Sequence, residues 1–495
     1  MIGLQNAHGE LWKALYYYRY VRPRASRLPG IKESSIVDSL RFSSKLSKWL
    51  DDESLVKRGK GTNWKRQYKL RHNWTQGSCA ISEIEVAEQP SFPPLLVFMH
   101  ESVVFMADSS DGLRAWSSRG ERKELARIAL PGVKPGSAPN PPTSIAVDAG
   151  SAATDDPLVV VGFQDGSYSM YKFHHPEGRF THRYSHAPST NGILSAVAVS
   201  LPYLLTMTAT QLLSLYSVSV DVESPPRLLY SLKSHTVWPP LSLSIRSSAQ
   251  YITAAIAYAL PTYLSGWTVG MQEMRLTMDG ELIVSRLASA IDQHFRPLTF
   301  SLNPSSVLPT PPQTPHPDSE ESETRQIHSK PSTISYTHPY LLVSHPDNTL
   351  TLYLVSSTST TLSISSGSRL WGHTSSVSGA HIGGKGKAVS VSTRGNELRI
   401  WDLEGGFTSS ASRRRLATGA MSVQIRPGTP NKFENDFEPV TEVMGGRSTG
   451  LRLALEHNVD DLTATRGWIG FDEESVIVLK EKGEGSQALV VYDFT

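Results

Sequence analysis

The chain has 495 residues, with 48 Lys and Arg against 46 Asp and Glu, and a single cysteine, Cys79. The nearly balanced charge gives no global indication of nucleic-acid or membrane binding, and one cysteine excludes an intrachain disulfide and a multi-cysteine metal site. We therefore expect a protein of a reducing compartment, cytoplasmic or nuclear, with no nucleic-acid partner and no membrane partner.

The first 80 residues differ from the rest, because they hold 16 Lys and Arg but only 6 Asp and Glu, a net charge of +10. Within them Trp64, Tyr68 and Trp74 recur at roughly helical spacing among basic residues. This pattern predicts an amphipathic helix whose aromatic stripe packs against another part of the protein, with the cations in water. The aromatic interleaving favours solvated helix faces over nucleic-acid contact.

From about residue 95 onward one unit recurs: an apolar strand, a tight polar turn, and a second strand that ends in an aromatic residue. About seven copies are found, at 103–116, 158–171, 193–216, 235–267, 341–353, 371–402 and 474–494. Seven such units predict an all-β propeller of four-stranded blades, and a two-sheet sandwich is the alternative. The alternating segment 78–87 is expected to close the ring as the partner of the last unit, since unpaired edges invite aggregation.

Two insertions interrupt the repeats. Residues 302–332 are rich in Pro, Ser, Thr and acidic residues, which predicts a disordered loop, and 404–466 is expected to be a long insertion. In the first, Thr310 and Thr314 each precede a proline and are candidate phosphorylation sites, while an unmodified loop is the alternative. Phosphorylation would add about −1.5 to −2 charges at each site.

No catalytic constellation is found in the sequence. There is no phosphate-binding Gly-rich loop with Lys-Ser/Thr, no His-Glu-x-x-His and no Gly-x-Ser-x-Gly turn. The histidines have no carboxylate or cysteine partners at metal-ligand spacing. We therefore expect no catalytic residues, no metal and no cofactor, and interpret the chain as a non-catalytic binding protein.

Residues 371–402 resemble a full WD repeat, which opens with Gly372-His373 and closes with Trp401-Asp402. The segment departs from that repeat at Gly395, which stands where an aspartate is usual. The hydrogen-bond network of His, Ser, Asp and Trp that the resemblance implies is therefore expected to be incomplete in this blade, leaving packing to hold it.

The N-terminal part resembles an F-box protein of the WD-repeat class. Residues 11–16 look like the last F-box helix, and 64–77 looks like the linker helix that docks the F-box onto the propeller. The expected domains are an F-box remnant at 1–28, a helical linker at 29–77 and the propeller at 78–495. With so few residues before Leu11, most of the F-box is expected to be missing through truncation, or else lost. The resemblance assigns Leu11, Trp12 and Leu15 to the remnant, and Trp64, Tyr68, Arg71, Asn73 and Trp74 to the linker.

This resemblance implies the substrate-recognition subunit of an SCF-type cullin ubiquitin ligase, which binds a protein, possibly phosphorylated, for ubiquitination and proteasomal degradation. A Skp-type adaptor and a cullin are the implied partners if the F-box is complete. A ligase-independent WD-repeat scaffold is the alternative. In a propeller, Gln164, His345, His373 and Arg394 are expected to rim one end of the channel as a substrate face. Arg394 suits contact with phosphate or carboxylate, although an exposed turn cation is the plainer interpretation.

Overall fold

The structure is a computed structural model, and it describes part of the chain. The described residues are 11–21, 63–89, 93–120, 122–131, 140–148, 156–175, 177–219, 224–233, 237–262, 266–290, 329–383, 386–395, 397–403, 414–415, 418–419, 422–427, 464–482 and 485–495. Within these ranges, no helix combines the length and the apolar character needed to cross a membrane.

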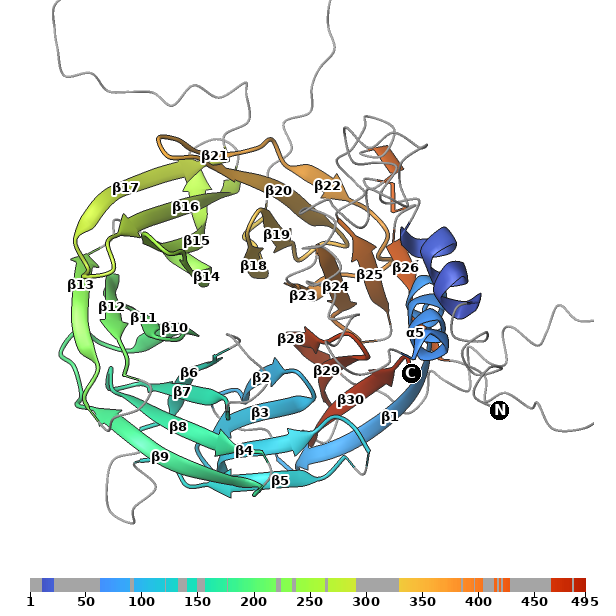
Figure 1. Cartoon of the computed structure of the whole chain (residues 1–495), viewed down its shortest axis with the longest axis horizontal. Coiled ribbons are helices and arrows are strands. Elements are labelled where there is room, and N and C mark those ends of the chain that lie inside the picture. The colour runs from blue at the N-terminus through green and yellow to red at the C-terminus, as the bar shows by residue number, and fades with distance from the viewer. Residues whose placement is uncertain are drawn as a thin grey trace, which may run out of the picture.

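Seven sheets are arranged in a ring (Figure 1), so the prediction of a seven-bladed propeller is confirmed. The first three blades are β2 (Leu96–His100) to β5 (Glu124–Ile128), β6 (Pro142–Val147) to β9 (Arg179–His186), and β10 (Leu194–Ser200) to β13 (Arg227–Lys233). Their middle strands are β3 (Val103–Asp108), β4 (Gly112–Ser117), β7 (Leu158–Phe163), β8 (Tyr168–His174), β11 (Tyr203–Thr208) and β12 (Leu212–Ser217). Each of these sheets is antiparallel, with its strands in chain order from the centre outward.

Blades 4 to 6 continue the ring. Blade 4 contains β14 (Trp238–Ser247), β15 (Ile252–Thr262), β16 (Gly266–Leu276) and β17 (Leu282–Ser289). Blade 5 contains β18 (Thr333–Thr337), β19 (Tyr340–Ser344), β20 (Leu350–Ser357), β21 (Leu362–Ile364) and β22 (Ser368–Leu370). Blade 6 contains β23 (Val377–Ile382), β24 (Lys387–Ser392), β25 (Leu398–Asp402) and β26 (Ser422–Gln424).

Blade 7 joins the two ends of the propeller sequence. It contains β28 (Ala464–Phe471), β29 (Ser475–Glu481) and β30 (Gln487–Asp493), and its fourth strand is β1 (Ser78–Ala87). β1 pairs antiparallel with β30, from Ala80 opposite Asp493 to Ala87 opposite Gln487. The prediction that 78–87 closes the ring is therefore confirmed. A short strand, β27 (Arg426–Pro427), pairs parallel with the start of β1.

A buried arginine ties blade 1 to this closing strand. The Arg114 guanidinium donates to the Val86 carbonyl oxygen at 2.6 Å and pairs with Asp108 at 2.5 Å. Both charged side chains are only 2% exposed. Breaking such a buried pair leaves an uncompensated charge, so the contact fixes blade 1 against blade 7.

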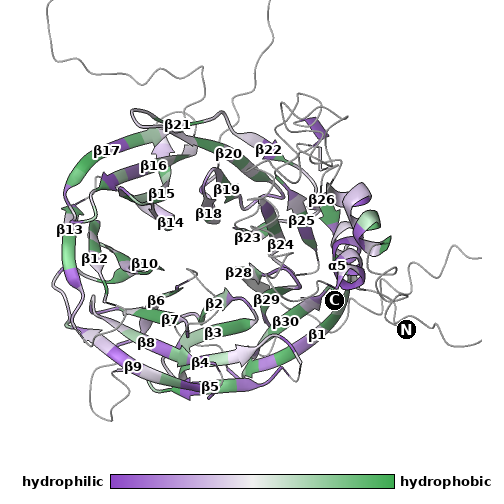
Figure 2. Ribbon diagram, viewed as in Figure 1, coloured by the Kyte–Doolittle hydropathy of each residue, from purple (hydrophilic) through white to green (hydrophobic). Residues whose placement is uncertain are grey.

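The middle strands form the core because each has a blade packed on both of its faces. All six residues are buried in β3 and in β7, whereas the outer strand β9 mixes exposed and buried positions. Figure 2 shows the hydrophobic residues along β3. This is why the second strand of each blade, which is the first strand of each repeated unit, appears in the sequence as a continuous apolar run.

Because the blades repeat one topology, equivalent turns gather at the same end of the propeller. The turns between second and third strands lie at one end, here called the distal end. The turns between first and second strands, and between third and fourth strands, lie at the other, here called the proximal end. Each end is therefore built from a different set of residues.

The predicted insertions are only partly within the described residues. β26, β27 and the start of β28 fall within 404–466, so this stretch contributes strands to blades 6 and 7. Residues 302–328, including Thr310 and Thr314, lie outside the described residues. Residues 329–332, the end of the predicted loop, are within the described residues, and the Lys330 ammonium lies 5.3 Å from the centre of the Trp267 ring.

Candidate functional site

Two helical segments precede the propeller and lie beside blades 6 and 7 (Figure 1). The first covers residues 11–21 and ends in a π-helical turn, η1 (Tyr17–Val21). The second is α5 (Trp64–Gln76). α5 begins at Asn63, whose side-chain oxygen accepts from the Arg66 backbone N–H at 3.1 Å. It ends at Gly77, which has φ +68°.

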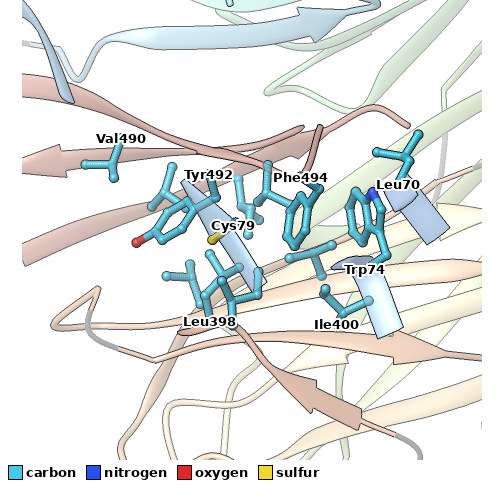
Figure 3. Close-up of a cluster of buried hydrophobic side chains, with 14 residues drawn as sticks. Leu70, Trp74, Cys79, Leu398, Ile400, Val490, Tyr492 and Phe494 are labelled. Atoms are coloured by element: carbon cyan, nitrogen blue, oxygen red, sulfur yellow. The ribbon is translucent and has the colours of Figure 1, made fainter. Parts of the chain in front are cut away.

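One face of α5 is buried against the propeller (Figure 3). The Trp74 ring, 3% exposed, stacks on Phe494 with centroids 4.2 Å apart, and its indole N–H donates to the Glu473 carbonyl oxygen at 2.8 Å. Leu70 lies in the same cluster as residues of blades 6 and 7, including Ile400 and Phe494. The helix therefore covers the junction of these two blades.

Polar contacts hold α5 at the proximal end. The Asn73 amide donates to the Phe494 carbonyl oxygen at 2.8 Å, and Arg66 pairs with Glu474 at 2.9 Å. Lys69 reaches the Thr495 carbonyl oxygen at 3.4 Å. Because these groups lie in the β28–β29 turn and just beyond β30, α5 is fixed to proximal turns, and the distal end faces away from it.

The other face of α5 packs against the first helical segment. Trp64 contacts Tyr16, with ring centroids 5.7 Å apart, and Tyr68 contacts Trp12 at 5.3 Å and Tyr20 at 5.5 Å. The prediction of a single aromatic stripe is therefore wrong. At 100° per residue Trp74 is turned well away from Trp64 and Tyr68, so the stripe divides into two faces with different partners.

The first helical segment also carries exposed apolar residues. Leu11, Leu15 and Tyr18 are 53%, 41% and 61% exposed. Their spacing of four and three residues places them on one side of the helix, here called the apolar stripe. Of the other residues assigned from the sequence, Trp12 packs on Tyr68, and Arg71 is half-buried on α5.

The structure divides the predicted substrate-face residues into two groups. Gln164 and Arg394 are exposed in the β7–β8 and β24–β25 turns, at the distal end. His345 and His373 are 5% and 3% exposed, and His345 Nε2 contacts the Thr351 hydroxyl at 2.8 Å. The expectation that these two histidines present their side chains to a substrate is therefore wrong, because each is buried within its own blade.

His373 belongs to a hydrogen-bond network in blade 6. Ser390 Oγ accepts from the Trp401 indole N–H at 2.8 Å and lies 2.6 Å from His373 Nε2. This leaves His373 Nδ1 facing a Glu397 carboxylate oxygen at 3.5 Å. Burial lowers the pKa of His373 to about 4, against the smaller opposing effect of Glu397, so the ring is neutral near pH 7.

The network is incomplete, as predicted from the sequence, because His373 Nδ1 has no hydrogen-bond partner among the described residues; beside it lies Glu397. Its carboxylate accepts from the Thr374 backbone N–H at 2.7 Å and from Arg399 at 2.9 Å. Burial alone would raise the pKa of Glu397, but these hydrogen bonds outweigh it and the pKa is lowered. Gly395, at φ +69°, shapes the turn, and the carboxylate nearest His373 Nδ1 comes from the glutamate two positions further on.

Three residues that pack against α5 were not among those assigned from the sequence. Phe494, which receives Trp74, lies next to the last residue of the chain, and the aromatic end of the last repeat was the available signal. Tyr16 and Tyr20 pack on α5, and the four tyrosines within residues 16–20 could have indicated them.

The profile of one protein family, described as the F-box protein pof12 beta-propeller, matches residues 79–495. The chain belongs to this family. The match extends from β1 to the C-terminus and includes all seven blades. No curated protein matches the chain.

Solved structures similar to this pof12-family propeller include three propellers of low identity. They are the WD40 beta propeller domain of Doa1 (11% identity, 83% of this chain and 95% of that chain, TM-score 0.39), the Myceliophteria thermophila Cps50 (Swd1) beta-propeller domain (9%, 84% and 100%, 0.43) and Saccharomyces cerevisiae Sqt1 (9%, 83% and 97%, 0.40). The seven-bladed architecture rests on the strand pairing of the chain itself.

Proposed function

We propose that the chain is the substrate-recognition subunit of an SCF-type cullin ubiquitin ligase. Its helical segments would face a Skp-type adaptor and cullin, and its propeller would hold the protein to be ubiquitinated. Family membership supports this proposal, because the matching family is that of an F-box protein propeller. On this proposal the chain supplies binding and geometry, and catalysis resides in other subunits.

The observation that carries the proposal is the arrangement of α5. It is fixed to the proximal end by Trp74 and Asn73, while Gln164 and Arg394 are exposed at the distal end. A receptor needs this separation, because the adaptor and the substrate must bind at the same time. The apolar stripe of Leu11, Leu15 and Tyr18 supplies a surface for an adaptor-facing contact.

The test is copurification of a Skp-type adaptor and cullin with the complete natural gene product. We expect both to copurify, and a double variant, Leu11→Asp with Leu15→Asp, to lose them. The matched control is Ile283→Asp, which places the same charge on a 56% exposed apolar residue of a distant blade. Circular dichroism would check that each variant is folded.

Two outcomes would count against the proposal. If the complete product binds no adaptor, the ligase-independent scaffold becomes the better interpretation. If the control loses the adaptor as readily as the double variant, the apolar stripe is not the contact. Loss confined to the double variant would support the receptor role.

A further inference from the structure

Three arginines gather on one glutamate where blade 4 packs against blade 5. Glu273 of β16 is fully buried, and it pairs with Arg246 of β14 at 2.9 Å, with Arg275 of β16 at 3.7 Å, and with Arg286 of β17. The strand register places these side chains on one face of the sheet, since Glu273 is opposite Arg286, and Arg246 and Arg275 both pair with the same residue of β15. We call these four residues the arginine cluster.

The charges of the arginine cluster do not cancel. Within the described residues, Glu273 is the only carboxylate in ion-pair distance of the three arginines. A guanidinium does not lose its proton in a protein, so an excess of two positive charges remains. Such an excess is unfavourable at a partly buried site unless an anion compensates it.

The cluster also keeps unused hydrogen-bond donors. The Nε atoms of Arg246, Arg275 and Arg286 are buried, and none has a hydrogen-bond partner among the described residues. The side chains of Arg286 and Arg275 are 8% and 13% exposed, and that of Arg246 is 35% exposed. Arg246 therefore stands at the surface, with the other two behind it.

Residues of blade 5 contact the arginine cluster from the neighbouring sheet. The Ser357 hydroxyl donates to Glu273 at 2.7 Å and accepts from Arg275 at 3.0 Å. Arg286 donates to the carbonyl oxygens of Thr358 at 2.8 Å and Thr361 at 3.0 Å. These contacts hold Arg275 and Arg286 in place, so binding of an anion by Arg275 would cost little further ordering.

The cluster lies at the proximal end. Its surroundings are the turns between β14 and β15, between β16 and β17, and between β20 and β21, all of which are proximal turns. It is therefore separate from the distal end, where Gln164 and Arg394 are exposed.

We propose that the arginine cluster binds a phosphate group, contacted by the exposed guanidinium of Arg246 and by Arg275 behind it. A phosphate monoester carries about −1.5 to −2 charges near pH 7, which matches the excess of two, whereas one carboxylate would leave half of it uncompensated. The planar guanidinium groups suit bidentate contact with phosphate oxygens. This site is independent of the proposed ligase function, and the ligand is a phosphate ester carried by a peptide or by a soluble polyphosphate.

The test measures the melting temperature of the full chain in increasing inorganic phosphate, with chloride keeping the ionic strength constant. A ligand that binds only the folded state raises the melting temperature. We expect this rise in the wild-type chain, and about tenfold weaker phosphate binding by isothermal titration calorimetry in Arg246→Gln. The control is Arg227→Gln, which removes the same charge from an exposed position on β13 and should keep the full rise.

The proposal fails if phosphate does not raise the wild-type melting temperature, or if Arg246→Gln keeps the same rise and affinity as Arg227→Gln. If Arg246→Gln does not fold, Arg246→Lys retains the charge but loses bidentate contact, and weaker phosphate binding by this variant is then the expected result. Competition by a phosphoserine peptide against its unphosphorylated form, and by inositol hexakisphosphate, distinguishes the two sources of phosphate.

Discussion

Single side chains hold blade 6 together through Ser390, which joins His373 to Trp401. All three residues are buried. Replacing one of these residues leaves its partners without hydrogen bonds in a region that water does not reach. The loss in the free energy of unfolding should therefore exceed that of a typical substitution at the surface.

We expect Ser390→Ala to lower the free energy of unfolding by about 2–4 kcal/mol, because His373 Nε2 and Trp401 Nε1 both lose their partner. The measurement is urea denaturation followed by tryptophan fluorescence. The matched control, Ser356→Ala, changes an exposed serine and should stay within about 0.5 kcal/mol of wild type. Equal effects of the two variants would contradict the importance of the network.

His373 should also make stability depend on pH. Its pKa is about 4 in the folded chain and 6.5 as the ordinary value, so between these pH values the unfolded chain binds more protons. The stabilisation is fully present above pH 6.5 and is lost as pH falls towards 4, by up to about 3 kcal/mol. We expect His373→Asn to lose less melting temperature than wild type between pH 7 and 5. Parallel pH profiles of the two proteins would exclude this coupling.

Among the elements, α5 connects the first helical segment to the propeller through two contact faces. Trp74 and Leu70 pack on the propeller, while Trp64 and Tyr68 pack on residues 11–21. The position of the first helical segment therefore depends on the docking of the second.

We expect Trp74→Ala to release α5 from the propeller, since loss of a buried aromatic side chain costs about 3–5 kcal/mol. Amide hydrogen exchange over 64–76 should accelerate, while exchange in the middle strands stays slow. Gln76→Ala, an exposed change on the same helix, is the control and should leave exchange unaltered. Protection equal to wild type in Trp74→Ala would mean that other contacts hold the helix.

Gly77 sets the angle between α5 and β1. Its φ is +68°, and a Cβ there would lie 2.3 Å from the Gln424 carbonyl oxygen. We expect Gly77→Ala to destabilise the chain by more than the ~1 kcal/mol of an ordinary glycine substitution, because backbone strain and a clash with the main chain add together. Gly120→Ala, also at positive φ but with nothing within 4 Å of the added Cβ, separates strain from the clash in thermal melts. The clash is unimportant if both variants melt alike.

At the scale of the whole molecule, ring closure depends on a strand that is distant in sequence from its partner. β1 covers the edge of β30, and Arg114 of blade 1 holds the end of β1 at Val86. Without β1, the edge of β30 would be unpaired, and Arg114 would lose the Val86 carbonyl oxygen that accepts its hydrogen bond.

We expect removal of residues 1–87 to give concentration-dependent aggregation, because β30 becomes an exposed edge. Removal of 1–62, which keeps α5 and β1, is the control and should remain monodisperse in size-exclusion chromatography with light scattering. Addition of a peptide of residues 78–87 should restore part of the monodisperse fraction. A monodisperse product without β1 and without the peptide would show that closure is not required.

The repeats were predictable because each hairpin is local: the apolar run at 158–163, the turn and the following aromatic strand lie within a few residues of each other. The closing strand at 78–87 was predictable from its alternation and from the need to cover an edge. The carboxylate beside His373 could not be predicted from position 395, because it comes from Glu397 along a turn whose shape the sequence pattern does not specify.

The class of fold, the number of blades and an aromatic helix before them were all predictable from the amino-acid sequence, since hydrophobic periodicity and turn residues act over short distances. Which side chains lie together depends instead on tertiary packing. It buried His345 and His373, divided the aromatic residues of α5 between two faces, and gathered arginines from three strands on Glu273. These outcomes depend on the packing of one blade against the next, which brings together residues that no local spacing connects.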